Sequence, residues 1–420
     1  MNLRAARGTR DVLPPEVDRW QRVESVARRT FALYGMQEIR TPIFEDSKVF
    51  EKGTGEQSEI VQKEMYRFID AGGHDLTLRP EGTPPVVRAY LEHRLAEGKD
   101  VTKLYYIGPM FRYERPQKGR YRQFHQIGAE AFGSEDPAVD AEVIEMAMFW
   151  LQELGVESPT LYINSVGDQD DRPSYMEKLV AAQREHLADL SEDSRTRHEI
   201  NPLRVFDSKD PRDQAVIEKL PTIVDHLSRG NRDHLDRVCT YLSDWGVEFQ
   251  LEPRLVRGLD YYRRTVFEIT SPALGAQDAL LGGGRYDGLV QQMGGKVDAP
   301  AVGFASGLER IVLAMPDEQP IPSVDCFVVT IDESVRAAGL DLMWRLRHSG
   351  VRTTADYQGR SLKAQMRAAN RSAAPTVVIV GPDEVTSGIF TIKRMSDGQQ
   401  VSSQTDSLAE DIRALLASEG

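Results

Sequence analysis

Apolar and polar positions change their period several times along the chain, and each period predicts a different kind of element. Apolar residues recur at helical spacing over 16–34, where Trp20, Val23 and Phe31 share one side and Gly35 ends the pattern. Further along, helices are expected over 84–97 and 137–154, strands over 38–44, 104–113, 122–132, 160–166 and 265–269, and a strand from 301 that gives way to a helix at about 307.

The strands predicted at 104–113 and 122–132 are joined by a basic loop. Alternation places two sets of side chains on opposite faces of the second strand: Arg122, Phe124, Gln126, Gly128 and Glu130, and then Gln123, His125, Ile127, Ala129 and Ala131. A cation, an aromatic ring, an amide and a carboxylate are unusual in a core. This face is interpreted as a pocket floor, with Gly128 leaving room for a ligand. An exposed basic hairpin on any β-sheet would show the same residues.

The pattern changes between 167 and 246, where charged helical segments predominate over 172–190, 213–228 and 232–245. A loop over 201–209, Asn-Pro-Leu-Arg-Val-Phe-Asp-Ser-Lys, lies between them. We interpret this region as a helical insertion into the preceding domain. A solvated helical subdomain without a partner is the alternative.

Three prolines mark residues 316–322 as a linker, and beyond it strands and helices alternate. The strands are expected over 325–331, 351–356, 376–381 and 389–395, and the helices over 334–349, 361–370 and 408–417. About 100 residues is an ordinary domain size, so the segment is predicted to form a separate α/β domain.

Composition narrows the class of protein. The chain has 420 residues, 40% hydrophobic and 28% charged, which suits two or three globular domains. Its net charge of -13 argues against non-specific polyanion binding, so a nucleic-acid partner needs a local basic patch such as 112–122. Two distant cysteines form no disulfide framework or zinc pattern, and the histidines lack ligand spacing, so no metal site is predicted. No stretch resembles a signal peptide or membrane span, and a cytoplasmic location is expected.

Three segments carry candidate chemistry. In the turn over 79–83, Glu81 is a carboxylate that could bind an ammonium group, while Thr83 suits either a helix cap or a ligand contact. Arg310 falls near a predicted helix N-terminus, where the dipole disfavours a cation unless a phosphate binds there; an arginine snorkelling to solvent is the alternative. The glycines over 282–284 lack the P-loop pattern and suit close approach of a ligand or strand.

Residues 111–126, Phe-Arg-Tyr-Glu-Arg-Pro-Gln-Lys-Gly-Arg-Tyr-Arg-Gln-Phe-His-Gln, resemble motif 2 of class II aminoacyl-tRNA synthetases in the form typical of histidyl-tRNA synthetases. The helix, strand and proline over 16–44 resemble motif 1, and residues 301–313 resemble motif 3. Arg257-Gly-Leu-Asp-Tyr-Tyr and Leu280-Leu-Gly-Gly-Gly-Arg-Tyr-Asp-Gly-Leu resemble the two histidine-specific motifs. The resemblance covers nearly the whole chain.

The resemblance implies an α+β fold: a class II catalytic domain on an antiparallel sheet with flanking helices (1–166 and 247–320), a helical insertion (167–246) and an α/β anticodon-binding domain (321–420). It also implies a homodimer built through motif 1. The implied reaction is histidine–tRNA ligation, in which ATP and L-histidine give histidyl-adenylate and pyrophosphate before histidine passes to the 3′ end of tRNA(His). ATP is then a substrate, with Mg²⁺ on its phosphates.

The resemblance also implies roles for individual residues, which suit charge neutralisation around two anionic reactants. Arg112 and Arg257 would be catalytic. ATP would be bound by Arg112, Arg120, Phe124 and Arg310. Histidine would be bound by Glu81, Thr83, Gln126, Glu130, Arg257, Tyr261 and Tyr262. On a regular strand Tyr261 and Tyr262 point oppositely, so strand alternation does not support both assignments equally. The tRNA acceptor end would meet Arg115 and Gln117.

Two other readings compete with the ligase. A regulatory paralogue of a histidine-biosynthesis phosphoribosyltransferase keeps the fold but charges no tRNA. Such paralogues generally lack the anticodon-type domain and catalytic residues, whereas this chain has Arg257 and a domain after Pro322. A tRNA-sensing module of a signalling protein is disfavoured because no kinase-like segment is present.

Overall fold

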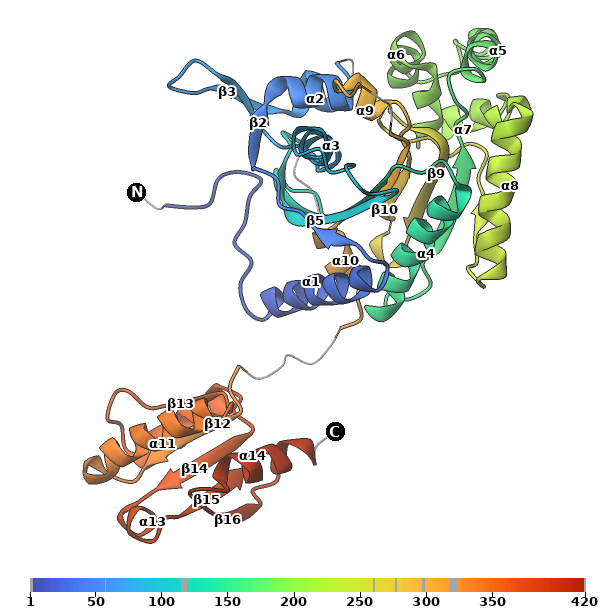
Figure 1. Cartoon of the computed structure of the whole chain (residues 1–420). Helices are drawn as coiled ribbons and strands as arrows, with labels where there is room; N and C mark the ends of the chain where they lie inside the picture. Colours follow the sequence, from blue (N-terminus) through green and yellow to red (C-terminus); the bar gives the residue numbers. More distant parts are fainter. Residues whose placement is uncertain are drawn as a thin grey trace. The chain divides into compact units, whose positions relative to one another are not determined.

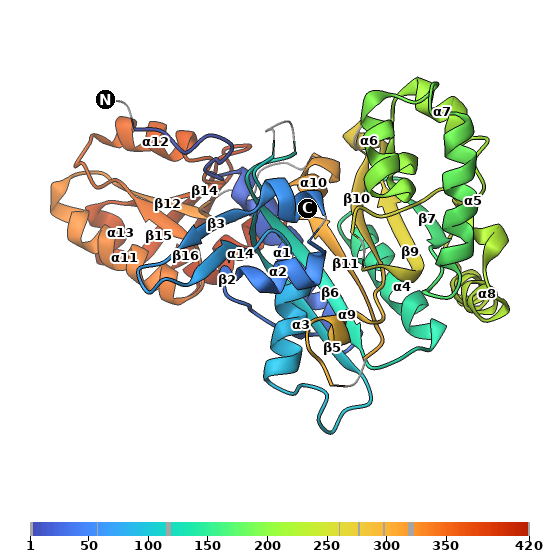
Figure 2. The ribbon, with the colours of Figure 1, turned by 90° about the horizontal axis from the view of Figure 1, so that it is seen from above.

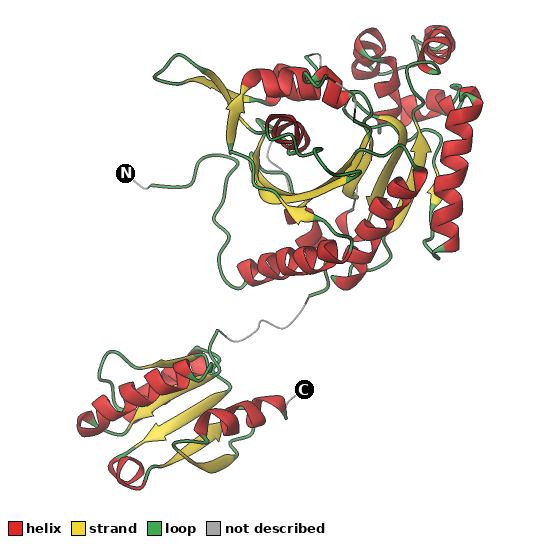
Figure 3. Ribbon diagram, viewed as in Figure 1, coloured by secondary structure: helices red, strands yellow, loops and turns green. Residues whose placement is uncertain are grey.

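The computed structural model describes residues 3–56, 58–114, 119–259, 261–275, 278–296, 299–317 and 323–418. The chain forms two compact units, Met1–Asp317 and Glu318–Gly420. Figure 1 traces the chain through both units, and Figure 3 shows their helices and strands. Among the described residues, no helix combines the length and apolarity needed to cross a bilayer.

The first unit is built on one large, mainly antiparallel sheet with the strand order β1-β5-β6-β11-β10-β9-β7-β8. Among the strand pairs of the described residues, the edge pairs β1 with β5 and β7 with β8 alone are parallel. In that order the strands are Gln37–Glu38, Thr102–Phe111, Gln123–Phe132, Ala301–Gly307, Ala279–Arg285, Arg263–Thr270, Thr160–Ser165 and Gln250–Leu251. The predicted α+β class and central antiparallel hairpin, β5 with β6, are confirmed.

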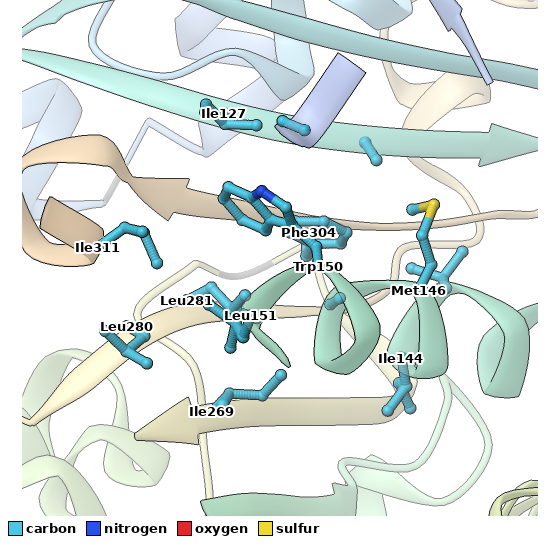
Figure 4. Packing of buried hydrophobic residues seen from close by; sticks show 14 of the residues in the cluster. Ile127, Ile144, Met146, Trp150, Leu151, Ile269, Leu280, Leu281, Phe304 and Ile311 are labelled. Carbon is cyan, nitrogen blue, oxygen red and sulfur yellow. The ribbon is translucent and has the colours of Figure 1, made fainter. Parts of the chain in front are cut away.

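Helices bury the two faces of this sheet against separate cores. One face packs on α1 (Glu16–Leu33), α4 (Pro137–Glu153), α8 (Arg229–Asp244) and α10 (Leu308–Ala314). Figure 4 shows Trp150 of α4 beside Phe304 of β11 in this core. The other face curves around α3 (Thr83–Glu92), with α9 (Leu289–Gln292) nearby (Figures 1 and 2). Packing on both faces fixes the middle strands in place.

Beside the main sheet lies a smaller one, ordered β2-β4-β3, with strands Phe44–Asp46, Asp75–Leu78 and Tyr66–Ile69. The helix α2 (Ser47–Thr54) follows β2, and a π-helix over Ile60–Glu64 precedes β3. The prediction of one strand over 38–44 is wrong. Arg79 Nη1 donates to the carbonyl oxygen and the hydroxyl of Thr41, at 2.8 and 2.9 Å, so a side chain takes the place of a neighbouring strand at this residue.

The region predicted as an insertion is helical. It contains α5 (Arg172–Glu185), α6 (Glu192–Ile200) and α7 (Pro211–Ile217), and the 3₁₀ helices η2 (Pro202–Asp207) and η3 (Ile223–His226). These elements share a small core that includes Tyr175, Leu179 and Val205. The single helix predicted over 213–228 is wrong: α7 ends at Ile217, and Pro221 lacks the N–H that a continuing helix needs.

The second unit has a five-stranded sheet ordered β13-β12-β14-β15-β16. Its strands are Thr353–Ala355, Cys326–Thr330, Thr376–Val380, Ile389–Arg394 and Gln400–Gln404, and its helices are α11 (Arg336–His348), α12 (Leu362–Arg371), α13 (Pro382–Ser387) and α14 (Leu408–Ala417), with a short 3₁₀ helix over Glu333–Val335. The predicted alternation is confirmed. The edge strand β16 was missed because its polar residues give no apolar period.

Candidate active site

Two adjoining cavities, of about 390 and 860 Å³, lie over the middle strands of the main sheet. They share a set of lining residues: Arg112, Glu114, Arg120, Gln126, Arg257, Gly258, Gly282 and Ala305. The smaller cavity ends in buried acids, whereas the larger one extends to the insertion and to α10. Strand β6 runs beneath both, and its alternation decides which side chains reach them.

The face predicted from the alternation of β6 is confirmed. Gln126 and Glu130 line the smaller cavity, and Phe124 lines the larger one. Ile127 and Ala129 are buried in the core beneath the sheet. The role predicted for Gly128 is wrong: a Cβ atom there would overlap the ring of Tyr106, so this side chain, and no ligand, fills the space above the glycine.

Glu130 sits at the closed end of the smaller cavity and is only 1% exposed. Its Oε1 accepts from the Thr83 hydroxyl at 2.7 Å, and its Oε2 accepts from the Tyr286 hydroxyl at 2.5 Å. Burial raises the pKa of Glu130 to about 8, against the opposing effect of these two donors. A carboxylate this deeply buried favours a ligand that brings an N–H group to it.

Thr83 does not cap α3. The N-cap position of that helix is Gly82, without a side-chain hydrogen bond, and the Thr83 hydroxyl is committed to Glu130. Of the two predicted roles for Thr83, the cap is therefore wrong. The side chain instead holds one oxygen of a buried acid in a fixed direction.

Glu81 forms a second buried acid beside the first. Its Oε1 accepts from the Thr54 hydroxyl at 2.5 Å and its Oε2 from the Tyr261 hydroxyl at 3.1 Å. Burial raises the pKa of Glu81 as well. Close by, Gln126 Oε1 is buried and has no hydrogen-bond partner among the described residues. Together these oxygens form an acceptor-rich pocket that suits a cationic group.

Tyr261 and Tyr262 both line the smaller cavity, with ring centroids 4.7 Å apart. Both precede β9, which begins at Arg263, so the alternation of a regular strand does not apply to them and both side chains reach the cavity. Burial raises the pKa of Tyr262 to about 12, so its hydroxyl remains a hydrogen-bond donor at neutral pH.

Arginines surround the open side of the cavities. Arg257 forms an ion pair with Glu268 of β9, and a Cβ atom at Gly282 would overlap its guanidinium, so only glycine leaves room for it. Burial alone would lower the pKa of Arg257, but Glu268 reverses the effect and the net shift is upward. Arg112 Nε donates to the Pro80 carbonyl at 2.8 Å, and its guanidinium carbon lies 5.4 Å from the Phe124 ring centroid.

Arg120 and Arg310 lie farther out. Arg120 Nη1 is 3.5 Å from Glu114 Oε2, and Arg310 Nε donates to the Ala279 carbonyl at 2.6 Å. Burial and the nearby Arg120 lower the pKa of Arg310. Two neighbouring cations favour binding of an anion between them. Both arginines line the larger cavity, which therefore suits an extended polyanion.

All the predicted site residues that the structure describes line one of these cavities. Arg115 and Gln117 lie outside the described residues. Sequence reasoning missed Tyr286, Glu268 and Arg204. Tyr286 follows the glycine run over 282–284, and Arg204 lies in the loop over 201–209, but no local pattern there predicts that these two side chains reach a cavity.

Comparison with known proteins follows the same division into two units. A family model described as histidyl-tRNA synthetase matches residues 8–311, and one described as anticodon binding domain matches residues 325–415. A histidine–tRNA ligase of Solibacter usitatus is 48% identical over 412 residues, which cover 98% of this chain and 99% of that relative. One of Bacillus subtilis is 45% identical over 421 residues, covering 99% of each.

Solved structures agree. Apo histidyl-tRNA synthetase of S. aureus superposes with a TM-score of 0.81 at 35% identity, covering 98% of this chain and 100% of that one. A Bacillus halodurans protein described as an ATP phosphoribosyltransferase regulatory subunit/histidyl-tRNA synthetase gives a TM-score of 0.65 at 21% identity, covering 89% and 97%. The second likeness concerns the fold alone.

Proposed function

The chain belongs to the histidyl-tRNA synthetase family, and from this premise we propose that its two adjoining cavities are where L-histidine and ATP react. The protein is an aminoacyl-tRNA synthetase, a ligase that uses ATP to attach histidine to tRNA. Relatives that are 45–50% identical over 94% or more of the chain are named as ligases. They favour charging over the regulatory alternative.

One observation carries the assignment of the site: a buried acid pair, Glu81 and Glu130, closes a cavity whose open side is lined by Arg112, Arg120 and Arg257. The acids suit the ammonium and ring N–H groups of histidine. The cations suit its carboxylate and the ATP phosphates. With acids at one end of the cavity and cations at the other, bound histidine would point its carboxylate toward ATP.

We assign the histidine side as follows. Glu130, held by Thr83 and Tyr286, accepts a hydrogen bond from one imidazole N–H, and Tyr262 donates to the other ring nitrogen. Glu81 and the unpartnered Gln126 Oε1 accept from the ammonium group, with Tyr261 orienting Glu81. Analogues without these nitrogens would leave buried polar atoms unpaired and would be rejected.

The same geometry supports adenylate formation. A carboxylate oxygen of histidine bonds to the α-phosphorus of ATP, the bond from that phosphorus to the bridging oxygen breaks, and pyrophosphate leaves. Arg112 and Arg257 would neutralise the charge at the α-phosphate, and Arg120 and Arg310 the outer phosphates. Phe124 would stack on adenine, with Arg310 over the opposite face.

We propose that Mg²⁺ enters with the nucleotide. Among the described residues, no three acidic, histidine or cysteine side chains converge to hold a cation. The residues that line the cavities therefore fit a metal carried mainly by phosphate oxygens and water. The ion would add positive charge at the outer phosphates.

Recognition of tRNA is assigned from the resemblance. We propose that residues 1–166 and 247–320 form the catalytic domain, that 167–246 grip the acceptor arm and that 321–420 bind the anticodon. Arg115 and Gln117 would meet the acceptor end. The test is transfer itself: purified protein given ATP, labelled histidine and a tRNA(His) transcript should accumulate histidyl-tRNA. Histidyl-adenylate formed without any transfer would contradict the charging function.

We also propose a homodimer. The small sheet β2-β4-β3 leaves Phe44 and Phe68 54% and 41% exposed on one face, and Ile69 64% exposed on the other. Exposed apolar side chains of this kind suit a subunit interface. Sedimentation at micromolar concentration should give a dimer, and the double variant Phe68→Asp, Ile69→Asp should shift it toward monomer. Trp344→Asp, an exposed position in the second unit, is the control. A wild-type monomer would contradict the proposal.

A cytoplasmic location is proposed because ATP, tRNA and reduced thiols occur together there. Cys239 and Cys326 are both unpaired in the structure, which suits a reducing compartment. Cell fractionation that places the protein outside the cytoplasmic fraction would contradict this.

A further inference from the structure

The insertion contributes a short 3₁₀ segment, η2 (Pro202–Asp207), to the walls of both cavities. Arg204 lines the smaller cavity, and Phe206 and Asp207 line the larger one. A segment far from the catalytic motifs in sequence thus faces the same space as those motifs.

The local fold aims this segment inward. Val205 is fully buried in the insertion's own core, which fixes one side of η2. In a 3₁₀ helix residues three apart lie above one another, so Arg204 and Asp207 share the same side. Their side chains meet in an ion pair, with Arg204 Nε 3.2 Å from Asp207 Oδ2. Gln183 Nε2 also donates to the Pro202 carbonyl at 2.9 Å, which anchors the start of the segment.

The Arg204 guanidinium lies directly beside the catalytic motif over 257–262. A Cβ atom at Gly258 would be 3.4 Å from Arg204 Nη2, an ordinary van der Waals distance, so the cation lies against this residue. The neighbouring residue is Arg257, itself paired with Glu268. Burial raises the pKa of Asp207, and the charges of Arg204 and Arg257 oppose that rise. The Asp207 carboxylate therefore lies near both cations. Both arginines line the smaller cavity, and each has a carboxylate partner, so the other N–H groups of each guanidinium suit an anionic ligand.

We propose that Arg204 is a further substrate-binding residue, which contacts an α-phosphate oxygen of ATP during histidine activation, at Gly258 where the two cavities meet, and is held for this by Asp207. This rests on the proposed site. The insertion therefore takes part in the first step of the reaction, before any tRNA binds. Arginine suits the task because one edge of its guanidinium can bond to Asp207 while the other faces the ligand.

The test is ATP–pyrophosphate exchange without tRNA, compared among wild type, Arg204→Ala, Arg204→Lys and Asp207→Asn. We expect Arg204→Ala to raise the KM for ATP at least about tenfold, as loss of a charge-assisted hydrogen bond would, with the KM for histidine nearly unchanged. Arg204→Lys should restore part of the loss. Asp207→Asn should give a smaller rise in the KM for ATP with the fold intact. This variant keeps the test decisive if Arg204→Ala folds poorly.

The matched control is Arg212→Ala, because Arg212 lies on α7 of the same insertion, is 69% exposed and pairs only locally with Asp210 among the described residues. It should behave as wild type. An unchanged KM for ATP in Arg204→Ala, with loss only in transfer to tRNA, would overturn the inference. Absence of histidine-dependent exchange in wild type would instead overturn the proposed function itself, so the two failures are distinguishable.

Discussion

Replacing Arg257 with alanine is expected to slow histidine-dependent pyrophosphate exchange by about 10³-fold or more while the protein still folds. Removal of one well-placed donor to developing charge typically costs about 10²–10³-fold. Here the loss is larger because Glu268, the partner of Arg257, keeps a negative charge in the cavity where the phosphates would lie. The measurement is exchange at saturating substrates, with thermal unfolding as the check on the fold.

Two further variants distinguish loss of the Arg257 charge from a general effect of mutation on the structure. Arg257→Ala combined with Glu268→Gln should recover part of the activity, because the repulsive carboxylate is removed. Arg229→Ala, at a position 95% exposed on α8, is the control and should leave exchange unchanged. Full activity in the Arg257→Ala variant would refute the role assigned to this residue.

Glu130→Gln is expected to raise the KM for histidine by about 10²-fold with little effect on the KM for ATP. Glutamine nearly preserves the volume, but it replaces one acceptor oxygen with a donor that faces either Thr83 or Tyr286. A site built to hydrogen-bond its substrate discriminates strongly when one partner is changed. Glu97→Gln, at an exposed position, is the control. Equal losses for ATP and histidine would contradict a role specific to the imidazole.

The raised pKa of Glu130 predicts two pH dependences, one of activity and one of stability. In the free protein the pKa of Glu130 is about 8, so kcat/KM for histidine should rise with pH up to that value. The Glu130→Gln variant should lack this rise. The folded chain also binds more protons than the unfolded chain between the usual pKa near 4.5 and about 8. This residue therefore makes the free energy of unfolding fall as pH rises through that window. Glu130→Gln should show a shallower fall in Tm between pH 5 and pH 8.

The local sequence pattern was sufficient to predict the direction of a side chain where that direction follows from the alternation along a strand. The alternation of β6 predicted that Gln126 and Glu130 face a cavity, and the structure confirms it because the strand is regular and its other face meets a large core. The glycines of β10 were predicted to allow close approach of a ligand or a strand, and Gly283 does so toward β11, because a Cβ atom there would overlap the Gly303 carbonyl.

Contacts between distant segments could not be predicted in the same way. Thr83 has the residue type and position of a helix cap, but Glu130, 47 residues away, takes its hydroxyl. The space above Gly128 is filled by Tyr106 from the facing strand, a register partner that the sequence of β6 alone does not reveal. Arg204 reaches the cavity only because the insertion folds back over the sheet, which no local period encodes.

The most direct test of the central claim, that these cavities activate histidine with ATP, is pyrophosphate exchange by the purified wild-type protein with each of the twenty amino acids in turn. We predict exchange with L-histidine and only background with the other nineteen, because the paired acids Glu81 and Glu130 recognise both the ammonium and the imidazole. Exchange with a different amino acid, or with none in a well-folded sample, would contradict the account.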